Sequence, residues 1–208
     1  MTKIIGLIGL RGSGKSACAE LMIEEYGQRI GRVEHSDAVL NLANQLHEQY
    51  NPSTAKQWQH AAQAMVSLEK VNSFDHHELH SFLSGKQLKF PINRANKNEF
   101  RNLLAWLGGY VQVALDDSYW DKKIATLIKQ AEKDHDIIFV GGARFSNNIK
   151  NISSLCGAIV KIERPGLEAV DSATTENRVN SLEYDYILIN DSDLAELKLK
   201  CQTLLENI

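Results

Sequence analysis

Apolar residues in this chain fall into short runs of strand length and into longer stretches with helical spacing. Short apolar runs favour buried strands, whereas apolar residues that recur with the period of a helix favour amphipathic helices. Strands are predicted at residues 3–8, 32–35, 136–142, 158–163 and 184–189. Because helical segments separate these strands, we predict a three-layer α/β fold with a five-stranded parallel sheet and helices on both faces.

Helical spacing marks the segments between the predicted strands. It is clearest at residues 17–26, 37–46, 55–71, 98–115, 119–133 and 194–205, and a short helix is expected at 74–83. Gly27 follows the first of these segments and suits a helix C-terminus. Residues 85–96 and 166–183 lack such spacing and are polar, which favours surface loops or segments that close over a ligand.

The connection between the first strand and the first helix carries the strongest chemical signal. It reads Gly9-Leu10-Arg11-Gly12-Ser13-Gly14-Lys15-Ser16 and matches the G-x-x-x-x-G-K-[S/T] pattern of phosphate-binding loops, or P-loops. Glycines allow the backbone to wrap closely around a phosphate, and the N–H groups then form an anion nest at the positive end of a helix.

This P-loop predicts a nucleoside triphosphate, ATP, and Mg²⁺ as ligands. Lys15 would contact the β- and γ-phosphates, and the Ser16 hydroxyl would ligate the metal. The residues expected to bind the nucleotide are Gly9, Arg11, Gly12, Ser13, Gly14, Lys15, Ser16 and Ala17.

Two charged residues follow predicted strands, at the edge where open parallel sheets bind their ligands. Asp37 follows the second strand, where it could cap a helix or face a phosphoryl acceptor or its metal, and both roles stay open. Arg144 follows the buried run 136–142 and is a candidate phosphate contact, although a loop arginine can also be a plain surface charge.

The composition limits the partners of the chain. A formal net charge of −3 gives no support for nucleic acid as the main partner. No apolar run approaches the ~20 residues of a membrane span, and no signal-peptide pattern is present. Cys18, Cys156 and Cys201 lack metal-ligand spacing, so we expect reduced thiols in a cytoplasmic protein. Residues 75–80 are rich in His but lack H-E-x-x-H spacing, which favours a solvated helix face over a metal site.

Further short motifs occur in a fixed order after the P-loop. They are Arg101-Asn102-Leu103-Leu104 with Leu107-Gly108, Ser118-Tyr119-Trp120, Ile138-Phe139-Val140 with Ala143-Arg144-Phe145, Glu163-Arg164-Pro165-Gly166, Thr174-Thr175-Glu176-Asn177 and Asp185-Tyr186-Ile187-Leu188-Ile189-Asn190-Asp191. With the P-loop, this order resembles the deoxynucleoside monophosphate kinases, in particular the phage-type enzymes. The resemblance covers the first 35 residues and most of residues 98–208.

The resemblance implies a P-loop kinase in which residues 1–208 form one domain, with a helical substrate-binding insertion at 38–97 and a lid at 166–183. It implies transfer of a phosphoryl group from MgATP to a deoxynucleoside monophosphate (dNMP). It aligns Arg101, Arg144 and Arg164 with arginines that contact nucleotide or phosphate, and Glu176 with a lid glutamate. Lys15, Arg101, Arg144 and Asp37 would then be the catalytic residues. The expected location is the cytoplasm, or the host cytoplasm for a viral protein, and a homodimer stays open.

Two positions depart from the family pattern. Gly142 stands where the family usually has an aspartate, and Ala173 stands where it has a histidine. These departures leave metal handling to Ser16 and Asp37. They also keep three alternatives open: another small-molecule P-loop kinase such as a dephospho-CoA kinase-like enzyme, a nucleotide-binding module without catalysis, and a motor or switch NTPase. The last is disfavoured because no apolar strand ends in a Walker-B carboxylate.

Overall fold

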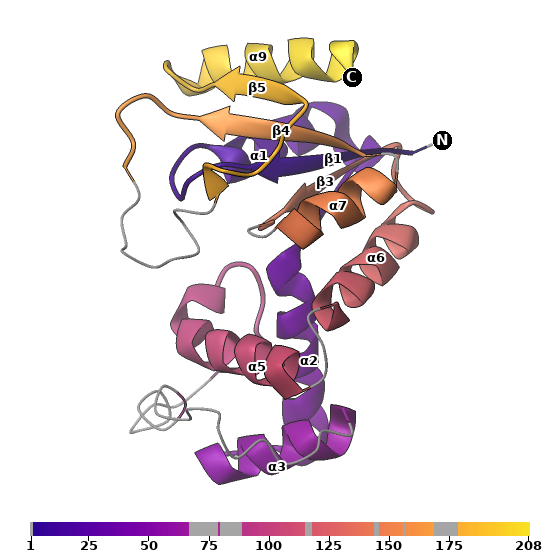
Figure 1. Cartoon of the computed structure of the whole chain (residues 1–208), viewed down its shortest axis with the longest axis vertical. Helices are drawn as coiled ribbons and strands as arrows, with labels where there is room; N and C mark the ends of the chain where they lie inside the picture. Colours follow the sequence, from indigo (N-terminus) through magenta and orange to yellow (C-terminus); the bar gives the residue numbers. More distant parts are fainter. Residues whose placement is uncertain are drawn as a thin grey trace. The chain divides into compact units, whose positions relative to one another are not determined.

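A computed structural model describes residues 2–66, 79, 89–114, 118–143, 146–155, 157–168 and 179–208. The chain divides into two compact units, one formed by residues 1–35 and 124–208 and the other by residues 36–123 (Figure 1). The elements, in chain order, are β1 (Lys3–Ile8), α1 (Lys15–Tyr26), η1 (Gly27–Arg29), β2 (Ile30–Glu34), α2 (His35–Tyr50), α3 (Ala55–Val66), η2 (Lys97–Phe100), α5 (Arg101–Ala114), α6 (Tyr119–Ala131), β3 (Ile137–Gly141), α7 (Ser146–Ser154), β4 (Ala158–Glu163), β5 (Tyr186–Ile189) and α9 (Leu194–Asn207).

The first unit contains a five-stranded sheet with the order β2-β3-β1-β4-β5. Every neighbouring pair of strands in it is parallel. The sequence prediction of a five-stranded parallel sheet is therefore confirmed. Strands β3, β1 and β4 are interior, and their near-continuous apolar sequences suit burial on both faces.

Helices cover both faces of this sheet. On one face, the buried side chains of Ile5, Leu7 and Phe139 belong to a core shared with Met22 of α1 and Leu197 of α9. On the other face α7 approaches β1 so closely that a Cβ at Gly6 would lie 3.1 Å from Ile152 Cδ1. Successive side chains along each strand thus pack against helices on opposite faces of the sheet, as a three-layer α/β fold requires.

Several predicted boundaries shift by one or two residues. The second strand is Ile30–Glu34, so the prediction of 32–35 was wrong at both ends, and His35 already begins α2. The last strand begins at Tyr186 and not at residue 184. Helix α7 was not predicted, because only Ile149 and Ile152 are apolar in its sequence SNNIKNISS. These two side chains suffice to bury one face of the helix against the sheet.

The second unit is a helical assembly with a large aromatic core. Trp58 of α3 and Trp106 and Tyr110 of α5 are at most 1% exposed, and the rings of Trp106 and Tyr110 stack with their centroids 5.2 Å apart. The segment 89–97 is fastened to α2, because the Asn44 side chain bonds both backbone groups of Ile92 at 2.8 and 2.7 Å. Part of the polar segment predicted at 85–96 is therefore held against a helix, and residues 85–88 lie outside the described residues.

Candidate functional site

The P-loop connects β1 to α1 in the conformation that its glycines permit. Gly12 and Gly14 have φ angles of +86° and +108°, in a region that L side chains rarely adopt. Gly14 is the N-cap of α1, which begins at Lys15. A Cβ at Gly9 would collide with the carbonyl oxygen of Ile162 in β4. The loop therefore turns tightly, and its backbone meets the positive end of α1 as the sequence predicted.

Lys15 lies across this loop. Its ammonium nitrogen donates hydrogen bonds to the carbonyl oxygens of Gly9 at 2.8 Å and Leu10 at 2.7 Å. Both acceptors belong to the loop itself, so the cationic end of Lys15 is held at the concave backbone. A phosphate bound in the loop would offer the ammonium charged oxygen acceptors, which form stronger hydrogen bonds than neutral carbonyls.

Asn190 follows β5 directly and contacts the P-loop, although it lies 177 residues after Ser13 in the sequence. Its Nδ2 donates a buried 2.8 Å hydrogen bond to the carbonyl oxygen of Ser13. Among the described residues no hydrogen-bond partner exists for the buried Ser13 Oγ. A buried hydroxyl without a partner is costly unless a ligand or water satisfies it.

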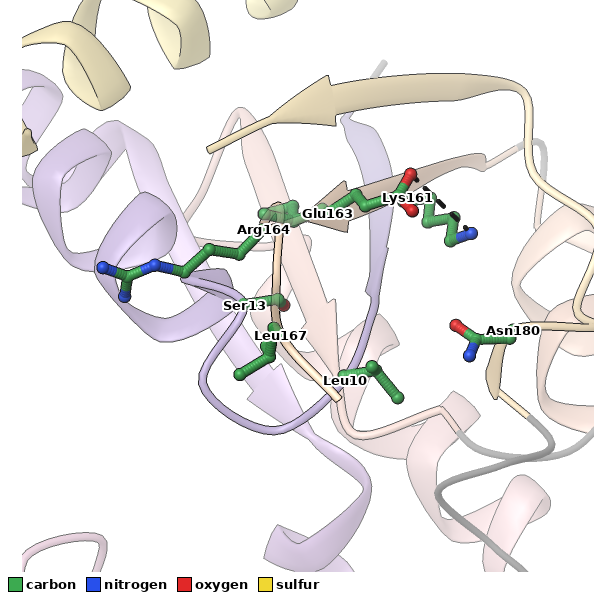
Figure 2. Close-up of a pocket in the computed structure, with 8 residues that line it drawn as sticks. Leu10, Ser13, Lys161, Glu163, Arg164, Leu167 and Asn180 are labelled. Atoms are coloured by element: carbon green, nitrogen blue, oxygen red, sulfur yellow. Dashed lines mark ion pairs between the residues drawn. The ribbon is translucent and has the colours of Figure 1, made fainter. Parts of the chain in front are cut away.

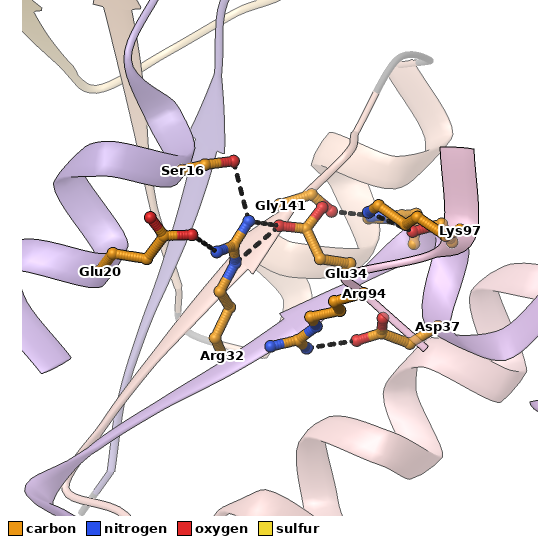
Figure 3. Close-up of polar contacts among 10 residues, drawn as sticks. Ser16, Glu20, Arg32, Glu34, Asp37, Arg94, Lys97 and Gly141 are labelled. Atoms are coloured by element: carbon orange, nitrogen blue, oxygen red, sulfur yellow. Dashed lines mark hydrogen bonds and ion pairs between the residues drawn. The ribbon is translucent and has the colours of Figure 1, made fainter. Parts of the chain in front are cut away.

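Ser16 belongs to a charged cluster that sequence reasoning missed. Arg32 of β2 donates from Nη2 to Ser16 Oγ at 2.9 Å and to Glu34 Oε1 at 2.7 Å, and its Nη1 lies 3.1 Å from Glu20 Oε1 (Figure 3). Burial disfavours the charge on Arg32, but the two glutamates outweigh it and raise the pKa of the guanidinium. Arg32 is therefore a permanent cation beside the predicted metal ligand.

A cavity of about 150 Å³ opens beside the P-loop (Figure 2). Its lining residues are Leu10, Ser13, Lys161, Ile162, Glu163, Arg164, Leu167 and Asn180. Arg164 thus lies next to the loop, and its guanidinium points away from Lys161 and Asn180. Its role as a nucleotide contact stays a prediction. Arg164-Pro165-Gly166-Leu167 forms a β-turn closed by a 3.1 Å hydrogen bond from Leu167 N to Arg164 O. Gly166 has a φ of +75°, which suits a glycine at that position of the turn.

In the second unit, Asp37 pairs with a basic residue that the sequence had placed in a polar segment. Arg94 Nη2 lies 2.6 Å from Asp37 Oδ2, and Lys97 Nζ lies 3.4 Å from Ser36 Oγ (Figure 3). The interpretation of Asp37 as an N-cap is wrong, because α2 begins two residues earlier. Arg101 is the first residue of α5 and is exposed.

The predicted site residues thus have different outcomes. The first unit brings Gly9, Arg11, Gly12, Ser13, Gly14, Lys15, Ser16, Ala17 and Arg164 together on and beside one loop. Asp37 and Arg101 belong to the second unit. Arg144, Glu176 and most of the predicted lid lie outside the described residues. Within the described ranges no three His, Cys, Asp or Glu residues are grouped to hold a metal ion, and no helix could span a membrane.

Comparison with known families covers most of the chain after the P-loop. Residues 36–201 match the family described as deoxynucleotide monophosphate kinase. The chain belongs to the deoxynucleotide monophosphate kinase family. The match begins after the P-loop, so the loop and the family assignment are independent observations. The resemblance noted in the sequence is therefore confirmed.

The alignments with individual relatives and solved structures cover most of this chain. A protein of Acanthamoeba polyphaga mimivirus, named "Putative deoxynucleotide monophosphate kinase", is 28% identical over 210 residues, which cover 93% of this chain and 91% of the viral protein. Among solved structures, the dephospho-CoA kinase from Campylobacter jejuni aligns with a TM-score of 0.49 and 14% identity, covering 99% of this chain and 97% of that one. The shikimate kinase from Aquifex aeolicus aligns with a TM-score of 0.45 and 12% identity, covering 98% and 96%.

Proposed function

We propose that this member of the deoxynucleotide monophosphate kinase family transfers the terminal phosphoryl group of ATP to a dNMP, giving ADP and the deoxynucleoside diphosphate. The observation that carries the proposal is the P-loop geometry, with Lys15 held on the loop and α1 beginning at that residue. The family match over residues 36–201 supports a dNMP as acceptor. Together they favour a nucleotide kinase over a dephospho-CoA kinase-like enzyme.

The P-loop would hold the triphosphate by its backbone N–H groups. The Ser13 hydroxyl is buried without a partner among the described residues, which fits a loop built to receive further acceptor oxygens. Lys15 would exchange its bonds to Gly9 and Leu10 for bonds to phosphate oxygens and would balance their charge. Since the acceptor phosphate is itself the nucleophile, catalysis depends on positioning and charge stabilisation more than on a strong base.

The residues near Ser16 also fit Mg²⁺. Hydroxyl and carboxylate oxygens are the ligands that Mg²⁺ prefers, and the ion is usually held by one or two protein groups together with substrate phosphates. Bound Mg²⁺ would neutralise charge on the phosphates, and Ser16 would hold it.

Acceptor binding is proposed for the polar groups of the second unit. Asp37 and Arg94 form a charged pair, and Lys97 and Arg101 add positive charge to the same unit. Arginines bind phosphate through two parallel N–H groups, which orients the bound group as well as holding it. Arg144, Arg164 and Glu176 stay proposed nucleotide contacts, and the bounds 38–97 for the insertion and 166–183 for the lid stay predictions, as does the cytoplasmic location.

The test is ATP-dependent phosphorylation of each dNMP and each ribonucleotide monophosphate, with product separation. We expect one or more dNMPs to give the diphosphate and stoichiometric ADP. ATP binding without turnover on any of these acceptors would instead select a binding module, and turnover on dephospho-CoA alone would select a different kinase.

A further inference from the structure

Two glycines at the end of β3 leave room for a carboxylate from the neighbouring strand. In the parallel pairing of β2 with β3, Glu34 lies opposite Gly141. A Cβ at Gly141 would lie 2.5 Å from Glu34 Oε1, and a Cβ at Gly142 would lie 3.4 Å from Glu34 Oε2. A side chain at Gly141 would collide with the carboxylate, whereas the position of a Cβ at Gly142 is in ordinary contact with it. Glu34 therefore fills the region beside Gly142, where the family pattern led us to expect an aspartate.

This carboxylate and the P-loop serine share one cationic nitrogen. Arg32 Nη2 donates to Glu34 Oε1 at 2.7 Å and to Ser16 Oγ at 2.9 Å, and Arg32 Nε adds a second bond to Glu34 at 2.8 Å (Figure 3). The Arg32 and Glu34 side chains are only 11% and 14% exposed. A hydroxyl oxygen and a largely buried carboxylate oxygen thus face the same positive group. Both are hard oxygen donors, the type that Mg²⁺ selects.

We propose that Glu34 is the metal-positioning carboxylate of this kinase and that Arg32 is a cationic latch that competes with Mg²⁺ for Ser16. The proposal rests on the proposed function, because the metal would arrive with ATP. The Arg32 guanidinium donates to Ser16 Oγ at 2.9 Å and would repel a divalent cation bound to the same oxygen, so Mg²⁺ binding would displace that hydrogen bond. Glu34 would then accept hydrogen bonds from metal-bound water, as carboxylates around Mg²⁺ commonly do. Arg32 stays paired with Glu34 and Glu20, so the displaced guanidinium keeps its countercharges.

The test measures Mn²⁺ binding to the protein–ATP complex, without acceptor, by the loss of the free Mn²⁺ signal in electron paramagnetic resonance. We expect Glu34→Gln to weaken Mn²⁺ binding about 10- to 100-fold, as is typical when a group that orients metal ligands is lost. The matched control is Glu20→Gln. It removes the same charge from a partner of the same arginine, but the Glu20 side chain is 64% exposed, and we expect the wild-type Mn²⁺ affinity.

Arg32→Lys provides the opposite prediction, because it shortens the latch and keeps the charge. We expect this variant to bind Mn²⁺ more tightly than the wild type. Equal Mn²⁺ affinities in Glu34→Gln and Glu20→Gln would overturn the proposal. If Glu34→Gln fails to fold, as judged by thermal unfolding, Arg32→Lys decides alone, and unchanged or weakened Mn²⁺ binding in it overturns the proposal.

Calorimetric titration with ATP in the presence of EDTA separates this inference from the proposed function. ATP binding that survives in Glu34→Gln, together with lost Mn²⁺ affinity, supports the inference. A wild-type protein that binds no ATP under any of these conditions would overturn the proposed function and the inference with it. ATP binding with a Mn²⁺ affinity that Glu34→Gln leaves unchanged overturns only the inference.

Discussion

Asn190 Nδ2 donates a buried 2.8 Å hydrogen bond to the carbonyl oxygen of Ser13, which joins the end of β5 to the P-loop. The same amide nitrogen lies so close to Gly14 that a Cβ at that glycine would collide with it. Asn190 is only 7% exposed, so it supports the loop from a buried position. The conformation of the P-loop therefore depends on a residue near the other end of the chain.

Removing this support should weaken ATP binding more than it weakens folding. We expect Asn190→Ala to raise the Kd for ATP about tenfold, because the loop loses a fixed hydrogen bond of ~1–1.5 kcal/mol and its preorganisation. Calorimetric titration with ATP measures the change. Asp193→Ala is the control. Asp193 lies nearby in sequence, but its side chain accepts a hydrogen bond from Glu196 N as the N-cap of α9 and not from the P-loop. Equal Kd values for wild type and Asn190→Ala would contradict the assigned role.

Arg94 should matter for the acceptor and not for ATP. We expect Arg94→Ala to raise the KM for the dNMP about tenfold or more, because a charge-assisted hydrogen bond contributes ~1.5–3 kcal/mol and the ion pair between Arg94 and Asp37 would be lost. Steady-state kinetics with each substrate varied in turn measure the two KM values.

The control for Arg94 is Arg29→Ala. Arg29 also pairs with one aspartate, Asp136, at 2.8 Å, but it lies in the first unit and its side chain is 70% exposed. We expect wild-type KM values for that variant. A KM for ATP that rises in Arg94→Ala as much as the KM for the dNMP would argue against a role in acceptor binding.

The core of the second unit should be sensitive to cavity formation. Leu103 of α5 is fully buried among the aromatic residues of that core. We expect Leu103→Ala to lower the free energy of unfolding by about 2–5 kcal/mol. Leu199→Ala is the matched control, because Leu199 is 57% exposed and such surface changes usually stay within about 0.5 kcal/mol. Urea unfolding followed by tryptophan fluorescence compares them, and equal losses would contradict the described packing.

Two of the three thiols should be unreactive in the folded protein. Cys18 of α1 and Cys201 of α9 are free and buried. A hydrogen bond with Cys201, together with burial, raises the pKa of the Cys18 thiol far above its ordinary value, so the reactive thiolate is scarce. In a Cys156→Ser variant we expect no reaction with Ellman's reagent under native conditions and reaction of both thiols after denaturation. Rapid labelling of the native variant would contradict the packing of α1 against α9.

The sequence predicted most strongly where local pattern decides the structure. A sequence motif predicts the P-loop and the first helix. Short apolar runs, separated by segments of helical spacing, predict the five parallel strands. Helix α7 escaped because its polar sequence needs only Ile149 and Ile152 to reach the sheet. Both ends of β2 were misplaced because strand boundaries are set by pairing with β3, which local sequence does not contain.

The supporting residues of the site were missed for a related reason. Asn190 and Ser13 are 177 positions apart, and no local pattern joins them. Arg32 and Glu34 alternate on a strand with Val33 buried between them, which is a weak sign that one face of an edge strand carries charge. Their relation to Ser16 and to Gly142 appears only when the sheet sets the register of β2 against β3. Position in the sheet, and not residue type alone, therefore identifies this part of the site.

The most direct measurement is the rate of ATP-dependent dNDP formation by the wild type and by Lys15→Ala, with Lys198→Ala as a control from the surface of α9. Lys198 forms an ion pair with Glu25 of α1, which is not a P-loop residue. We predict that Lys15→Ala lowers kcat/KM at least about 100-fold, the scale expected for loss of one group that stabilises transition-state charge, while Lys198→Ala keeps the wild-type rate. A wild-type rate in Lys15→Ala would contradict the claim that this loop binds the triphosphate and supports phosphoryl transfer.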